Sequence, residues 1–187
     1  SAADIVQINA KTDGGLYFDG TDTDGVINKL SASQDLTTSA AATFGEGDFI
    51  SGFAIGTDVI KIGGALATAL EGSGATTVMA TAGIDGDAVG IVIVDNAVAT
   101  VANDKFGDLS DVAADIDTAL TGSSNNTNGD EFIIVLSNAA NTQKGIYYLK
   151  DADFAADLGA DAGDTLALLA IVDHGTAGDF LATSVVV

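Results

Sequence analysis

The chain has 187 residues, of which 47% are hydrophobic but only 6% aromatic, and its formal net charge is −21 at pH 7. This length and apolar content favour a single folded domain over residues 1–187 rather than a disordered chain. The charge argues against nucleic-acid binding and against contact with anionic membrane surfaces, because a polyanion is repelled by both. The sequence has no apolar run as long as a membrane span, and it has no cysteine, so no disulfide framework exists.

The type of acidic residue is informative. Of the 27 acidic residues only Glu46, Glu71 and Glu131 are glutamate, and all six cations are lysine. Aspartate is short, bends turns and places carboxylate oxygens close to backbone carbonyls, which suits Ca²⁺. A salt-adapted surface would show a similar bias, so composition leaves these two explanations open.

The chain begins at Ser1 and its only methionine is Met79. We therefore expect a processed product or an excised fragment. No secretory pattern stands near residue 1, although such a segment can be removed during export.

The first quarter predicts short strands around a dense acidic loop. Strands are expected at 3–8, 16–18 and 26–30, and a loop rich in Ser, Thr and Ala at 31–43. The loop after the second strand carries Asp19, Asp22 and Asp24. Its spacing does not fit an EF-hand, so it is either a different kind of Ca²⁺ loop or a hairpin turn whose acids cap backbone amides.

The segment 47–62 is the most structured pattern in the sequence. Val59, Ile60 and Ile62 flank Lys61, which predicts a strand leaving a Gly-Thr-Asp turn. Gly56 can adopt the positive φ that such a turn requires. The side chain of Asp58 can bond its own backbone or face a cation, and an ordinary turn before a strand is the simpler interpretation.

The middle of the chain predicts one or two helical turns at 65–70 and strands at 77–80, 91–94 and 98–101. Asp85 and Asp87 lie in the first connection between these strands, and Asp95-Asn96 suggests a two-residue hairpin in the second. The run 91–94 is apolar without alternation, so both its faces are expected to be covered.

One amphipathic helix is predicted near 108–121. Its apolar stripe is Leu109, Val112, Ala113, Ile116 and Leu120. Asp108 or Ser110 can cap its start, and Gly122 stops it. A polar loop, 123–130, follows this helix.

The last third predicts a strand at 132–136, a turn at 138–141, a returning strand at 145–149 and closing strands at 165–172 and 181–187. Many short strands, dense turns and one helix indicate a mainly β fold, a sandwich or roll. Residues 15–18 resemble 145–148, and 47–49 resemble 178–180, which suggests related β-modules at 1–62 and 130–187.

Three pieces of the chain carry a family resemblance, and together they span roughly residues 44–187. They are 50–53 with 56–60; 132–136 and 145–149 followed by an acidic loop and 164–169; and 178–181 with 185–187. In these pieces the chain resembles the C-terminal region of RTX-like, type I-secreted calcium-binding bacterial surface proteins, with their S-layer and adhesin relatives. The glycine-rich nonapeptide repeats of that group are missing, so the resemblance implies isolated acidic turns rather than a calcium ladder. It also implies export through a C-terminal signal and a role at the cell surface or outside the cell, and it does not imply an enzyme.

Catalytic chemistry finds little support in the sequence. His174 is the only histidine and enters a turn, and no Gly-x-Ser-x-Gly elbow is present. Zinc requires clustered His or Cys, which are lacking. Calcium is the remaining chemistry, and its candidate ligands are Asp19, Asp22, Asp24, Asp58, Asp85, Asp87, Asp151, Asp153 and Asp157.

We therefore expect a secreted, non-enzymatic structural protein. It would self-associate through exposed edge strands into an extracellular surface layer, matrix or filament, with Ca²⁺ at acidic turns. One alternative is a C-terminal export and folding module of a larger secreted enzyme or adhesin. Another is a glycan-binding β-domain, which the absence of Trp disfavours.

Overall fold

The computed structural model describes residues 5–8, 17–19, 34–35, 48–101, 105–123, 129–151 and 164–187, and before residue 49 the backbone alone. The fold is mainly β, as the sequence predicts. The strand expected at 26–30 lies outside the described residues. Within the stretch expected to be a loop, 31–43, two residues form the short strand β3, because they add to the edge of a longer strand near the C-terminus.

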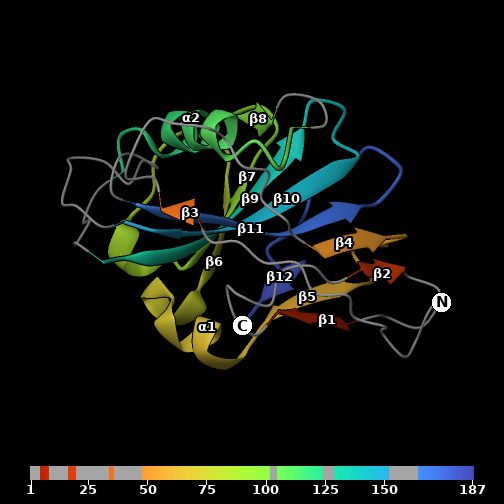
Figure 1. The fold of residues 1–187 in the computed structure, drawn as a ribbon, viewed down its shortest axis with the longest axis horizontal. Helices are drawn as coiled ribbons and strands as arrows, with labels where there is room; N and C mark the ends of the chain where they lie inside the picture. The colour runs from red at the N-terminus through yellow and green to blue at the C-terminus, as the bar shows by residue number, and fades with distance from the viewer. Residues whose placement is uncertain are drawn as a thin grey trace.

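A nine-stranded mixed sheet forms the centre of the structure (Figure 1). Along the sheet the order is β2 (Tyr17–Asp19), β4 (Asp48–Ser51), β11 (Thr165–Asp173), β10 (Gln143–Lys150), β9 (Glu131–Asn138), β7 (Ile91–Val94) and β6 (Thr76–Met79), with β3 (Gln34–Asp35) on β11 and β8 (Thr100–Val101) on β9. Every pairing is parallel except those of β10 with its two neighbours and of β3 with β11. The strands β2 and β6 that end the sheet therefore run in the same direction.

The expected hairpin at Asp95-Asn96 is wrong. Strands β7 and β8 do not pair with each other; both pair in parallel with β9, one after the other along its length. The Asp95 carboxylate accepts from the amide of Ala97 at 2.8 Å, which closes a local turn and carries the chain along β9 instead of back beside β7.

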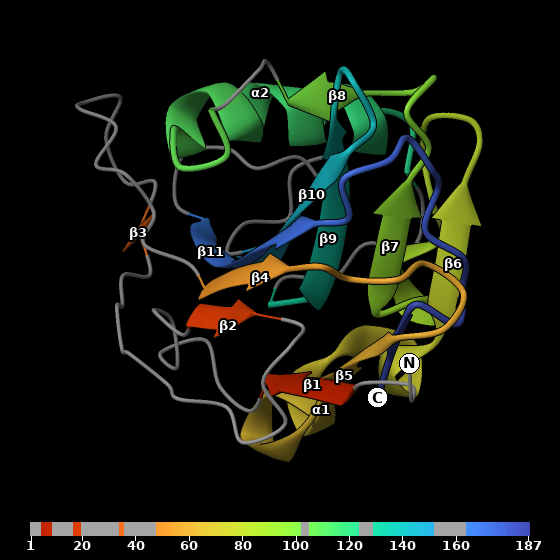
Figure 2. The same ribbon diagram turned by 90° about the vertical axis from the view of Figure 1, so that its right-hand side faces the viewer.

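A second, smaller sheet and two helices cover the faces of the main sheet. Strands β1 (Ile5–Ile8), β5 (Val59–Ile62) and β12 (Val185–Val186) form a three-stranded parallel sheet, close to helix α1 (Gly64–Ala69). Helix α2 (Leu109–Leu120) lies on the opposite side (Figure 2). The short 3₁₀ helices η1 (Glu71–Gly74) and η2 (Gly86–Ala88) flank β6.

The central strands alternate their side chains between two hydrophobic cores. On β9, Phe132, Ile134 and Leu136 pack beneath α2, whereas Ile133 and Val135 face the small sheet. The four residues of β7 are all buried for the same reason, as the unbroken apolar run predicts. This two-sided burial explains why the central strands read as continuous apolar segments rather than as alternating ones.

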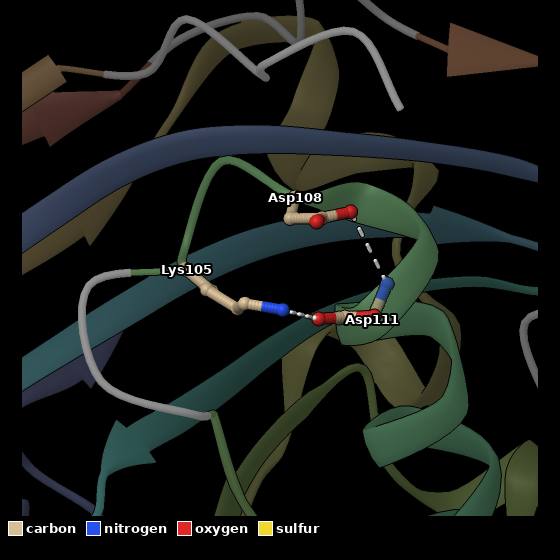
Figure 3. A network of polar contacts seen from close by, with 3 residues as sticks. All are labelled: Lys105, Asp108 and Asp111. Atoms are coloured by element: carbon tan, nitrogen blue, oxygen red, sulfur yellow. Dashed lines mark hydrogen bonds and ion pairs between the residues drawn. The ribbon is translucent and has the colours of Figure 1, made fainter. Parts of the chain in front are cut away.

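Helix α2 begins and ends where the sequence predicts. The Asp108 carboxylate accepts from the Asp111 amide at 3.5 Å and caps the first turn, while the ammonium of Lys105 pairs with the Asp111 carboxylate (Figure 3). At the other end Gly122 adopts φ 82°, the left-handed conformation that terminates helices. The apolar stripe of the helix faces the core formed with β9 and β10.

The cap gives a first prediction. Asp108→Ala removes a side-chain acceptor from an otherwise unbonded helical amide and should lower the free energy of unfolding by about 1 kcal/mol. Lys105→Ala, which breaks an exposed ion pair in the same turn, should lower it less. Urea unfolding followed by circular dichroism measures both; equal losses in the two variants would contradict this role for Asp108.

Candidate functional site

The outer edge of β6 is a candidate surface for pairing with another strand. The amides of Ile91 and Asp95 donate to the carbonyls of Ala75 and Met79, so these groups of the β6 segment face β7. Backbone groups alternate between the two sides of a strand, and the amide and carbonyl of Val78 therefore point away from the sheet. The side chain of Val78 is 42% exposed, which is unusual for a valine on a strand.

A shallow groove of about 310 Å³ runs along this edge. Its apolar lining includes Val78, Met79, Ile84 and Val89. The start of β6 is partly covered, because the Thr76 hydroxyl donates to the Val185 carbonyl at 3.1 Å. The open part of the edge is thus centred on Val78.

The structure accounts for Asp58 as a turn residue. Its carboxylate accepts from the Ala54 amide at 2.7 Å, and the amides of Thr57 and Asp58 both donate to the Ala54 carbonyl. Gly56 has φ 79°, the positive value that the sequence predicts for this turn. Asp58 is buried and acts within the turn that leads into β5.

Of the remaining candidate metal ligands, the structure describes the side chains of Asp85, Asp87 and Asp151. Asp85 and Asp87 are exposed on either side of the start of η2. Asp19 ends β2, and only its backbone is described; Asp22, Asp24, Asp153 and Asp157 lie outside the described residues. Within the described part of the chain, no group of three or more His, Cys, Asp or Glu side chains is placed to hold a metal ion.

Asp151 belongs to an acidic cluster at one end of the central strands, and the sequence patterns do not predict this cluster. It follows β10 directly, and it is buried together with Asp130, which precedes β9, and Asp164, which precedes β11. The three strands are neighbours, so the three residues lie side by side at the same end of these strands. Asp130 and Asp151 are joined through a backbone bond, Asp151 amide to Asp130 carbonyl, at 3.0 Å.

A cluster around the buried Lys144 lies at the other end of the central strands, where β7, β9 and β11 end. The ammonium donates to the Ser137 hydroxyl at 2.6 Å and to the Asn141 side-chain oxygen at 2.5 Å, and it lies 5.6 Å from the centre of the Phe180 ring. Burial lowers the pKa of Lys144 to about 8, although the carboxylates of Asp179 and Asp95 oppose the shift. Carboxyl ends of parallel strands are the usual place for ligands in open sheets.

The hairpin tip of this cluster is tied to the segment that follows β11. Asn141 has φ 54°, a left-handed conformation that asparagine tolerates. Its side-chain nitrogen, Nδ2, donates to the Asp179 carboxylate at 2.6 Å. The Gly178 amide donates to the Asn141 carbonyl at 3.0 Å. The Phe180 ring that follows stacks on Phe53 with centroids 5.2 Å apart.

His174 borders the same cluster. Its Nδ1 lies 2.8 Å from the Thr176 carbonyl oxygen, and because that oxygen can only accept, Nδ1 carries the proton of the neutral ring. Burial lowers the pKa of His174 below its ordinary value, and the Lys144 charge adds to the effect; the Thr176 carbonyl and the carboxylates of Asp173 and Asp179 oppose it. The described residues place no hydrogen-bonded nucleophile at this histidine.

Sequence patterns miss the Lys144 cluster because the returning strand is expected to begin at Gly145. Strand β10 instead begins at Gln143, which places Lys144 inside the sheet opposite Ser137. The one sequence signal that could have revealed this cluster is the position of Lys144 among residues that form a strand.

Comparisons of the chain with protein-family models, with curated proteins and with solved structures found no match. No helix among the described residues is both long enough and apolar enough to span a bilayer.

The lowered pKa of His174 gives a prediction about acid stability. The unfolded state takes up a proton near pH 6.5 and the folded state only at lower pH, so acidification through this range favours unfolding. His174→Asn preserves a donor to the Thr176 carbonyl but cannot titrate. Relative to this variant, the wild type should lose unfolding free energy as the pH falls from 7.5 to 5 in urea titrations; a constant difference would contradict the assignment.

Proposed function

We propose that the protein is a secreted, non-enzymatic structural protein that self-associates through its open sheet edge, with Ca²⁺ offsetting its negative charge. The observation that carries the proposal is the β6 edge, where the outward-facing backbone groups and the exposed side chain of Val78 border a groove lined by both apolar and polar residues. Natural proteins usually protect such edges with charges, proline or bulges, and none of these stands within β6.

The sheet topology would allow copies of the chain to add to one another in a single repeated orientation. Strands β2 and β6 end the sheet on its two sides and run parallel, so β6 of one copy and β2 of the next would continue the same ladder. A head-to-tail contact of this kind yields an open filament when the rotation between successive copies does not close a ring. Strand addition to an exposed edge supplies affinity through main-chain hydrogen bonds.

The net charge of −21 opposes this assembly. Copies brought edge to edge repel one another until cations bind or screen them. Exposed acidic side chains such as Asp85 and Asp87 are the places where Ca²⁺ would bind or screen this charge. The proposed location is outside the cell, where millimolar Ca²⁺ sites are useful.

Val78→Lys tests the edge. A lysine there places an ammonium in the pairing surface yet reduces the magnitude of the negative net charge, so electrostatics alone would promote association. We expect light scattering and sedimentation to show loss of assembly in Ca²⁺ for this variant. Leu181→Lys makes the same charge change at an exposed apolar residue outside β6 and should assemble like the wild type.

Equal assembly of both lysine variants would contradict the role of β6. A wild-type chain that stays monomeric at high concentration with millimolar Ca²⁺ would favour the alternative, a C-terminal export and folding module of a larger secreted protein.

Calcium removal tests the second half of the proposal. We expect the melting temperature to be several degrees higher in millimolar CaCl₂ than in EDTA, because an ion that binds only the folded state stabilises it by mass action. NaCl at matched ionic strength separates binding from screening, which is not ion-specific. Identical melting temperatures in all three buffers would contradict Ca²⁺ binding to the folded chain.

A further inference from the structure

The Asn141 side-chain amide is held at both of its polar atoms. Its oxygen contacts the Lys144 ammonium, and its nitrogen donates to the Asp179 carboxylate at 2.6 Å. Few surface asparagines have an amine at one end and a carboxylate at the other. The left-handed backbone of Asn141 turns this side chain back toward the start of β10, where Lys144 lies three residues later.

The surroundings prepare Lys144 for nucleophilic chemistry. Its side chain is 2% exposed and is oriented by the Ser137 hydroxyl, with the Phe180 ring close to the amine and Phe53 stacked behind that ring. With a pKa of about 8, about one molecule in ten carries the neutral amine at pH 7, far more than for an ordinary lysine. Desolvated lysines of this type are known nucleophiles toward carbonyl carbons.

We propose that Nζ of Lys144 attacks Cγ of Asn141 and forms an intramolecular isopeptide bond, with Asp179 as the proton-transfer group. The new bond is Nζ–Cγ, and the bond that breaks is Cγ–Nδ2 of Asn141. Asp179 takes a proton from the attacking amine and passes it to the departing nitrogen, which leaves as ammonia. The reaction needs no oxidant, reductant or cofactor.

The reaction removes a positive charge from a buried site. A buried ammonium is unfavourable, and its conversion into a neutral amide ends that penalty while ammonia escapes to solvent. The link joins residues only three positions apart, so it constrains little of the unfolded chain and acts on the hairpin tip rather than on global stability. This inference concerns the hairpin tip and does not depend on assembly through β6.

Mass spectrometry of the full chain tests the proposal. We expect the purified protein to be lighter than its sequence mass by one ammonia, and a lysine-specific protease to leave the chain uncut after Lys144. Lys144→Arg should restore the sequence mass, because the guanidinium is protonated and does not attack. Asp179→Asn, an exposed change that keeps the shape of the side chain, should slow the mass loss in freshly purified protein.

Lys150→Arg is the matched control, since Lys150 lies at the other end of β10 and pairs with the Glu131 carboxylate at 2.8 Å. It should lose ammonia as the wild type does. A full sequence mass in the wild type would overturn the proposal. So would an ammonia loss that persists in Lys144→Arg and is accompanied by hydroxylamine cleavage of the chain between residues 141 and 142, because that pattern identifies a succinimide at Asn141 instead of a cross-link.

Discussion

The burial of both faces of β7, β9, β10 and β11 is the constraint on which the structure depends. Helix α2 covers one face, and the small sheet with α1 covers the other, so the side chains of these strands alternate between two apolar cores. Each buried aliphatic or aromatic side chain contributes roughly 1.5–3 kcal/mol relative to exposure. No polar group can be placed on either face of these strands without a hydrogen-bonding partner.

Chemistry is therefore confined to the borders of the sheet. Asp130, Asp151 and Asp164 gather at one end of the central strands, and Lys144 with its partners occupies the other. The third border, β6, has no charged residue within the strand, and Val78 is exposed beyond the part that Val185 covers. In the proposed assembly this separation would let β6 pair with another copy while exposed acidic positions remain within reach of cations.

Local patterns predict much of this fold. The stripe of α2, its Asp108 cap, the positive φ at Gly56 and the strand Val59–Ile62 all follow from neighbouring residues and are confirmed. Strand direction is not local: β7 and β8 pair with β9 because of how their faces pack, and the Asp95 turn gives no sign of it. The Lys144 cluster escapes prediction for the same reason, since Phe180 and Asp179 approach it only in the folded chain.

Hydrogen exchange at β6 reports whether this edge pairs with another copy. In the monomer the Val78 amide points outward and should exchange fast, whereas the amides of Thr77 and Met79, directed at β7, should be protected. On assembly in Ca²⁺, protection should rise at Val78 and stay unchanged at its two neighbours. Assembly that leaves Val78 exchanging at the monomer rate would contradict pairing through this edge.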